Sequence, residues 1–185
     1  MNGLALALLW LAATPPALAS DTVAGGAAAQ VRAGADGRGE VRASIDIAAP
    51  PERVWRTILD CRLAARMTPS VKRCTVLERS PDGRTETREH WIKRGLFSPM
   101  LRSVSRLELE PGRRITFRCV GGDIDDCEGQ WLLTPLDGGA ATRVVYENKV
   151  SAPFGLPAGM AAAAMRRDVP SALRALEREC LENRP

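Results

Sequence analysis

The sequence of 185 residues has few of the groups on which catalytic and metal-binding sites most often depend. It holds one histidine and no pair of cysteines at C-x-x-C spacing, so a zinc site is not expected. A nucleophile activated by a general base is also hard to assemble, because histidine most often serves as that base. His90 lies in a segment that alternates like a strand, and we expect it at the surface. We therefore predict no catalytic residue, no cofactor and no metal.

Aromatic residues and long hydrophobic runs are scarce as well. Phe, Trp and Tyr make up 4% of the chain, and the basic residues are scattered along it. Proteins that bind nucleic acids more often gather these residues on one face, with aromatic side chains that stack on bases. No nucleic-acid partner is therefore expected. The composition, 45% hydrophobic and 26% charged, is that of one globular domain.

The beginning of the chain has the pattern of an export signal. Residues 4–13 are apolar, but far fewer than the roughly 20 of a membrane-spanning helix. Thr14-Pro15-Pro16 and then Ala17-Leu18-Ala19 follow, and the last three supply the small side chains that signal peptidase accepts. We predict a signal peptide over residues 1–19, cleaved after Ala19, and a periplasmic or secreted protein. An uncleaved anchor is the alternative, because no Lys or Arg precedes the apolar run.

The rest of the chain divides into a lead-in and one domain. Residues 20–39 are rich in Ala and Gly and predict a flexible segment, so the domain is expected over residues 40–182. Alternating apolar and polar residues predict strands at 41–47, 71–80, 85–93, 102–110, 114–120, 128–135 and 142–150. Short helices are expected at 51–59 and 61–67, and one long helix at 156–182 with a bend near Val169, because Pro170 follows it.

This order of elements predicts an α+β fold: a seven-stranded antiparallel sheet, two short helices after the first strand, and a long C-terminal helix across the concave face. It resembles the helix-grip fold of the START-like (SRPBCC) superfamily. Three phrases strengthen the resemblance: Ile47-Ala48-Ala49-Pro50-Pro51-Glu52-Arg53-Val54-Trp55, Gly129-Gln130-Trp131-Leu132-Leu133 and Thr142-Arg143-Val144-Val145-Tyr146. The subgroup that the chain looks most like contains coenzyme-Q-binding proteins and polyketide cyclases.

The resemblance implies a cavity between the sheet and the C-terminal helix that binds or carries a hydrophobic small molecule, such as a lipid, a quinone or a polyketide-like compound. Transient membrane contact to load the ligand, and a monomer, are expected. The alternatives are a polyketide-cyclase-like or hydrolase-like enzyme on the same fold, or a protein-interaction module. Binding is favoured over catalysis because no catalytic constellation is visible.

Alternation along the strands and the spacing of the last helix indicate which side chains face this cavity. The same positions would pack the core if the cavity were small. Tyr146 and Asn148 could add polar groups for a ligand headgroup. The candidates are Trp91, Ile115, Phe117, Trp131, Val144, Tyr146, Met160 and Met165.

Five cysteines in an exported chain favour disulfides. Cys61 and Cys74 flank the second short helix, and a bond between them would close a loop of about 14 residues and stabilise the fold by roughly 3 kcal/mol. Cys119 and Cys127 could face each other across a hairpin, unless the register is shifted by one residue. Cys180 is the candidate for the unpaired thiol. The alternative is that some of these cysteines are small buried hydrophobic residues.

Overall fold

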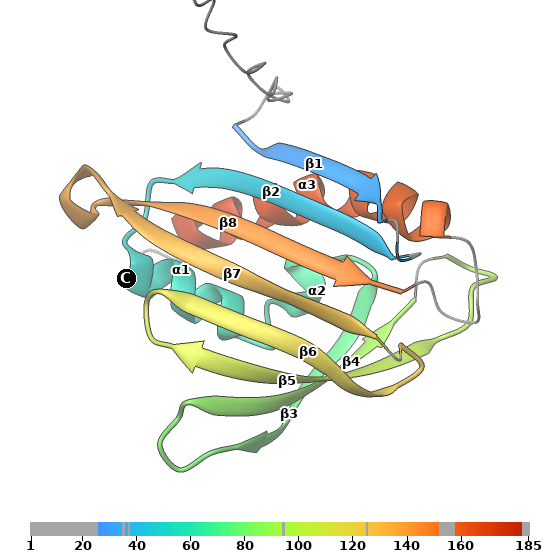
Figure 1. Ribbon diagram of the computed structural model, residues 1–185. Helices are drawn as coiled ribbons and strands as arrows, with labels where there is room; N and C mark the ends of the chain where they lie inside the picture. The colour runs from blue at the N-terminus through green and yellow to red at the C-terminus, as the bar shows by residue number, and fades with distance from the viewer. Residues whose placement is uncertain are drawn as a thin grey trace, which may run out of the picture.

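The computed structural model describes residues 26–34, 36, 38–93, 95–124, 126–151 and 158–182. It shows one antiparallel sheet with the helices on one of its faces (Figure 1). We call this side the inner face and the opposite side the outer face. The predicted signal peptide lies outside the described residues. Within those residues, no helix is both long and apolar enough to cross a membrane.

Eight strands form the sheet in the order β1-β2-β8-β7-β6-β5-β4-β3, and every neighbouring pair is antiparallel. Two helices follow β2, a short 3-10 turn (η1) precedes β8, and one long helix follows β8. The elements are β1 Ala28–Ala33, β2 Gly39–Ile47, α1 Pro51–Leu59, α2 Ala64–Met67, β3 Val71–Arg79, β4 Thr85–Ile92, β5 Leu101–Glu110, β6 Arg114–Gly122, β7 Cys127–Leu136, η1 Asp137–Gly139, β8 Ala141–Val150 and α3 Ala158–Glu182.

The α+β class and the helix-grip arrangement are confirmed, with one strand more than predicted. Strand β1 lies in the segment expected to be a flexible lead-in, and it pairs with β2 from Ala28 opposite Ser44 to Ala33 opposite Gly39. Ala29 and Val31 pack against the core from this strand. Small alanine side chains hide the alternation of a strand, which is why the sequence did not indicate it.

Helix α1 begins where the sequence predicts it. Pro51 occupies the first turn, where its missing N–H is not needed, and Glu52 lies at the positive end of the helix dipole. Val54 and Ile58 bury their side chains one turn apart. Helix α2 is shorter than the predicted 61–67, because residues 61–63 form a turn.

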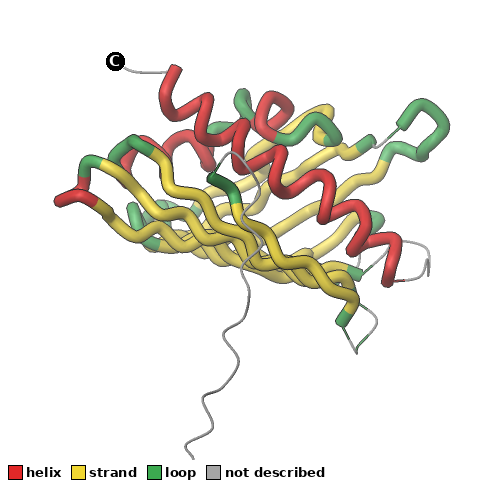
Figure 2. Tube along the Cα trace, turned by 90° about the horizontal axis from the view of Figure 1, so that it is seen from above, coloured by secondary structure: helices red, strands yellow, loops and turns green. Residues whose placement is uncertain are grey.

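Helix α3 runs across the inner face of the sheet (Figure 2). It contacts β1, β2, α1 and α2. Leu173 and Leu176 of α3 and Ile45 and Ile47 of β2 are among the largest fully buried side chains. Pro170 lies inside α3, and the helix continues through it. The core therefore lies between the helices and the inner face, and it extends from β2 to Ile115 on β6 and Leu107 on β5.

Two disulfides hold the connections in place. Cys61 is bonded to Cys74, which ties the segment between α1 and α2 to β3, and Cys119 is bonded to Cys127, which ties β6 to β7. The Cα atoms of the two pairs are 5.2 Å and 5.0 Å apart. These are the pairs that the sequence suggested. Cys180 is free and buried in the core.

Candidate functional site

Three aromatic rings lie together on the inner face, one on each of three neighbouring strands. Phe117 of β6, Trp131 of β7 and Tyr146 of β8 are only partly buried. The ring centroid of Tyr146 is 4.4 Å from that of Trp131 and 6.2 Å from that of Phe117. The three rings form an apolar surface against which another apolar group can pack, and we call them the aromatic cluster.

Gly129 gives one of these rings its position. It pairs with Phe117 on one side and with Asn148 on the other. A Cβ atom at Gly129 would lie 2.5 Å from Cζ of Phe117 and 3.0 Å from Cα of Asn148. Because glycine has no side chain, the ring of Phe117 can lie over β7 toward β8.

Tyr146 and Asn148 add polar groups to the edge of the aromatic cluster. They are two residues apart on β8 and therefore point to the same face. Burial raises the pKa of the Tyr146 hydroxyl to about 12, against a smaller lowering by a hydrogen bond from the Asn148 side chain. The Oδ1 atom of Asn148 is buried and has no hydrogen-bond partner. The Tyr146 hydroxyl is therefore protonated at neutral pH, and the Asn148 amide has no ionisable group.

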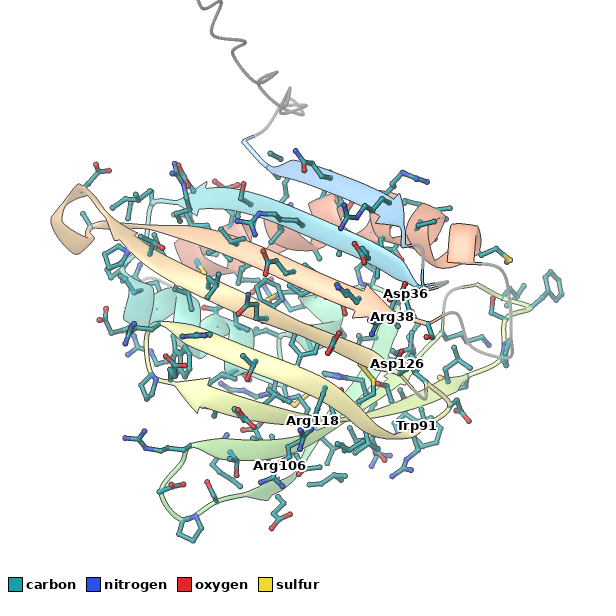
Figure 3. All side chains as sticks on the ribbon, viewed as in Figure 1. Asp36, Arg38, Trp91, Arg106, Arg118 and Asp126 are labelled. Atoms are coloured by element: carbon teal, nitrogen blue, oxygen red, sulfur yellow. A yellow bond between two sulfur atoms is a disulfide. The ribbon has the colours of Figure 1, made fainter. Side chains whose placement is uncertain are left out.

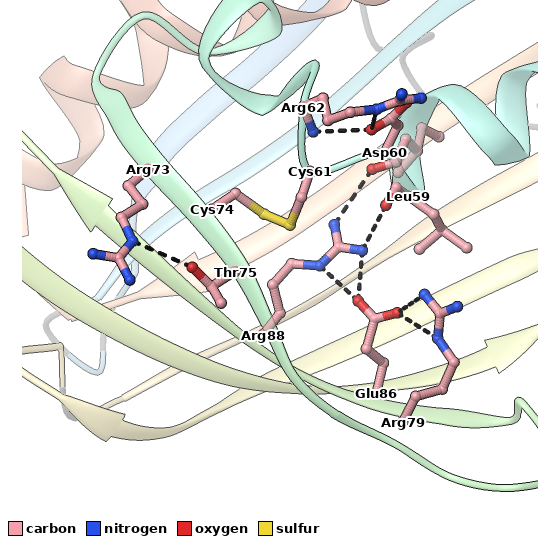
Figure 4. The surroundings of a disulfide bond; sticks show 11 residues. Leu59, Asp60, Cys61, Arg62, Arg73, Cys74, Thr75, Arg79, Glu86 and Arg88 are labelled. Carbon is pink, nitrogen blue, oxygen red and sulfur yellow. Dashed lines mark hydrogen bonds and ion pairs between the residues drawn. A yellow bond between two sulfur atoms is a disulfide. The ribbon is translucent and has the colours of Figure 1, made fainter.

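A buried ion-pair network lies farther along the inner face, on β4 (Figure 4). The side chain of Glu86 is 0% exposed and forms ion pairs with Arg88, at 2.6 Å, and with Arg79, at 2.5 Å. Arg88 donates hydrogen bonds to the carbonyl oxygens of Leu59, at 2.9 Å, and Ile58, at 3.5 Å. The network joins β4 to the carboxyl end of α1, where helix carbonyl groups lack partners within the helix.

His90 lies on the same face as Arg88, because alternate residues of a strand share a face. His90 pairs with Cys74 of β3 and Ser103 of β5. Cys74 forms a disulfide with Cys61, which lies between α1 and α2, so this face of the sheet is the one that the helices cover. Burial, and in second place the charge of Arg88, lower the pKa of His90 to about 4. The expected surface position of His90 is therefore wrong: the imidazole is largely buried and neutral at pH 7.

Trp91 lies on the outer face, away from the aromatic cluster (Figure 3). Its indole Nε1 donates a hydrogen bond of 2.9 Å to Glu89, which also accepts one of 2.6 Å from Arg102. Alternation shows that His90 and Trp91 face opposite sides, but not which side is covered by helices. The buried charges of Glu86 and Arg88 explain the error, because they make the inner face of β4 look solvent-exposed in the sequence.

The remaining candidates divide into core and surface. Ile115, Val144 and Met165 are buried in the core cluster. Met160 is exposed in the first turn of α3. The structure thus brings Phe117, Trp131 and Tyr146 together, and their side chains pack against the buried core.

The outer face carries a hollow of a different kind. It has a volume of about 400 Å³ and lies over β5 to β8. Side chains of both charges line it, including Arg106 and Arg118, which are paired across β5 and β6 (Figure 3). An apolar ligand gains little from such a lining. Nowhere among the described residues do three His, Cys, Asp or Glu side chains come together as they would around a metal ion.

Comparison with known proteins places this arrangement in a class. The fold is that of START-like proteins, in which a long C-terminal helix covers an antiparallel sheet. A family model described as "Polyketide cyclase / dehydrase and lipid transport" matches residues 47–177. The chain belongs to this family. No curated protein matches it in sequence.

Solved structures agree with this assignment. A STAR-related lipid transfer protein from Xanthomonas axonopodis is similar with a TM-score of 0.75 and 17% identity, over 88% of this chain and 98% of that one. The protein TTHA0849 from Thermus thermophilus has a TM-score of 0.67 and 26% identity, over 79% and 99%. The Zhui aromatase/cyclase from a Streptomyces species has a TM-score of 0.64 and 22% identity, over 78% and 94%.

Proposed function

We propose that the inner face of the sheet binds a hydrophobic small molecule, such as a lipid, a quinone or a polyketide-like compound, and carries it outside the cytoplasm. The observation that carries this proposal is the partly exposed aromatic cluster of Phe117, Trp131 and Tyr146. Exposed aromatic surface beside a packed core is costly in water and is covered favourably by an apolar ligand. The family's description, which includes lipid transport, supports the same function.

The location outside the cytoplasm is supported by two features. Disulfides persist in oxidising compartments, and the structure pairs four of the five cysteines. The first 19 residues have the pattern of a signal peptide. Sequencing the N-terminus of the protein from the periplasm or medium tests this part: it should begin at Ser20, and an intact Met1 would contradict cleavage.

We also propose that one end of the domain touches a membrane while the ligand is loaded. The β4-β5 connection and the beginning of α3 lie at the same end of the molecule (Figures 1 and 2). At this end Leu96 and Phe97 are 82% and 97% exposed, and Met160 is also exposed. Apolar side chains near Lys93 and Arg102 suit the surface of a bilayer with anionic lipids.

Membrane contact can be tested by sedimentation with vesicles of phosphatidylcholine and phosphatidylglycerol. The double variant Leu96→Ser/Phe97→Ser should remain in the supernatant, whereas the wild type should sediment. Leu77→Ser is the control, because Leu77 is exposed on β3, outside this loop. Equal sedimentation of all three proteins would contradict the loading surface.

The binding function is tested by native mass spectrometry and organic extraction of the protein, purified without detergent from its own host. A co-purifying apolar molecule is expected, and it should be lost from Trp131→Ala but retained by Trp91→Ala. Thermal unfolding of both variants shows whether each is folded. A wild-type protein that carries nothing and binds none of a panel of lipids, quinones and polyketides would refute the proposal.

A further inference from the structure

The buried Oδ1 atom of Asn148 is the one polar side-chain atom of the described residues that is both buried and without a partner. Native proteins keep few such atoms, because a buried acceptor without a donor has lost its hydrogen bond to water. Asn148 lies on β8 between Val41 of β2 and Gly129 of β7. The amide nitrogen of Asn148 can donate to the hydroxyl of Tyr146, but this leaves the Oδ1 atom without a donor among the described residues.

The neighbours of Asn148 place this acceptor at the ligand-binding face. Tyr146 points to the same face and brings a hydroxyl group, which can both donate and accept a hydrogen bond. Gly129, which is paired with Asn148, has no side chain, and the ring of Phe117 lies over its Cα atom. The acceptor and the hydroxyl are thus adjacent to the aromatic cluster.

We propose that Asn148 Oδ1 accepts a hydrogen bond from a hydroxyl group of the bound molecule, so that the ligand class is apolar alcohols and phenols. This inference rests on the proposed binding function. The Tyr146 hydroxyl supplies a second hydrogen bond to the same group. A hydrocarbon would leave the acceptor unpaired. A carboxylate would place a negative charge beside the Oδ1 acceptor. Val41 and Gly129, the residues paired with Asn148 on the neighbouring strands, carry no positive charge to offset it.

The test compares two ligands that differ by one hydrogen-bond donor. 2-Naphthol and 2-methoxynaphthalene are titrated against protein loaded with the fluorescent probe N-phenyl-1-naphthylamine. One net hydrogen bond predicts that the wild type prefers 2-naphthol by about fivefold. Asn148→Leu has a similar shape and no acceptor, so it should bind both compounds equally or prefer the ether. Lys149→Gln, on the opposite face of β8, should keep the preference of the wild type.

A second measurement does not depend on ligands. Asn148→Leu removes the unpaired acceptor but also the hydrogen bond to Tyr146, so it is compared in the Tyr146→Phe background, where that bond is absent. In this background the empty protein with Asn148→Leu should melt at a higher temperature than the empty protein with Asn148. A lower melting temperature would mean that Asn148 Oδ1 is hydrogen-bonded in the empty protein, and would overturn the inference. Equal affinity of the wild type for 2-naphthol and its ether would also overturn it, while leaving the proposed function intact. Failure of the wild type to bind the probe or either naphthalene would instead refute the proposed function, and this inference with it.

Discussion

The buried pair of Glu86 and Arg88 gives the sharpest prediction about stability. In Arg88→Met, the fully buried carboxylate of Glu86 keeps only Arg79, whose side chain is 56% exposed. The carbonyl groups of Ile58 and Leu59 also lose their donor. Removing one partner of a buried ion pair typically costs roughly 3–5 kcal/mol. We therefore expect the free energy of unfolding to fall by about this amount.

Urea unfolding followed by circular dichroism measures this loss. With a urea dependence of about 2 kcal/mol per molar, the midpoint should fall by roughly 1.5–2.5 M. Arg79→Met is the matched control and should lower the free energy of unfolding by no more than about 1 kcal/mol, because Arg79 is largely solvated. The double variant Glu86→Leu/Arg88→Met should recover most of the loss, because it leaves no unpaired buried charge. A midpoint for Arg88→Met close to that of the wild type would refute the reasoning.

Three further predictions concern single features of the fold. Mass spectrometry with thiol labelling should find two disulfides and one free thiol at Cys180, and five labelled thiols would contradict the pairing. The single histidine, His90, should titrate near pH 4 by NMR rather than near 6.5. Because folding lowers its pKa, the contribution of His90 to the free energy of unfolding is full above pH 6.5 and is lost as the pH falls toward 4. Gly129→Ala should destabilise by about 1–3 kcal/mol, since its Cβ would clash with the backbone oxygen of Glu147 and would lie 2.5 Å from Cζ of Phe117. Gly121→Ala, with its nearest atom at 4.0 Å, should cost far less, and equal losses would argue against the packing at Gly129.

The strands of the sheet were predictable because their alternation is strong. The segment 41–47 buries Val41, Ala43, Ile45 and Ile47 on one face and exposes Arg42 and Asp46 on the other, as period-2 patterning requires. Strand β1 escaped prediction because its alanines carry little hydrophobic contrast, and its position depends on pairing with β2, which is distant in the local pattern.

The candidate site was predictable only in part. Alternation on β6, β7 and β8 placed Phe117, Trp131 and Tyr146 on one face, and the structure brings their rings together. On β4 the side chains that face the helices include the buried Glu86 and Arg88, so charged positions face inward and the assignment of Trp91 was reversed. Burial of charge depends on partners that are distant in sequence, here the carbonyl groups of α1, and local patterns do not report them.

The proposed apolar ligand binds on the inner face, beside Trp131 and away from Trp91. Fluorescence quenching with 12-bromododecanol tests this position, because bromine quenches tryptophan emission at short range. Saturating the chain from Ser20 with this alcohol should quench part of its emission. The quenched fraction should fall in Trp131→Phe and rise in Trp91→Phe. The opposite pattern, with quenching lost in Trp91→Phe and kept in Trp131→Phe, would place the ligand on the outer face and contradict the account.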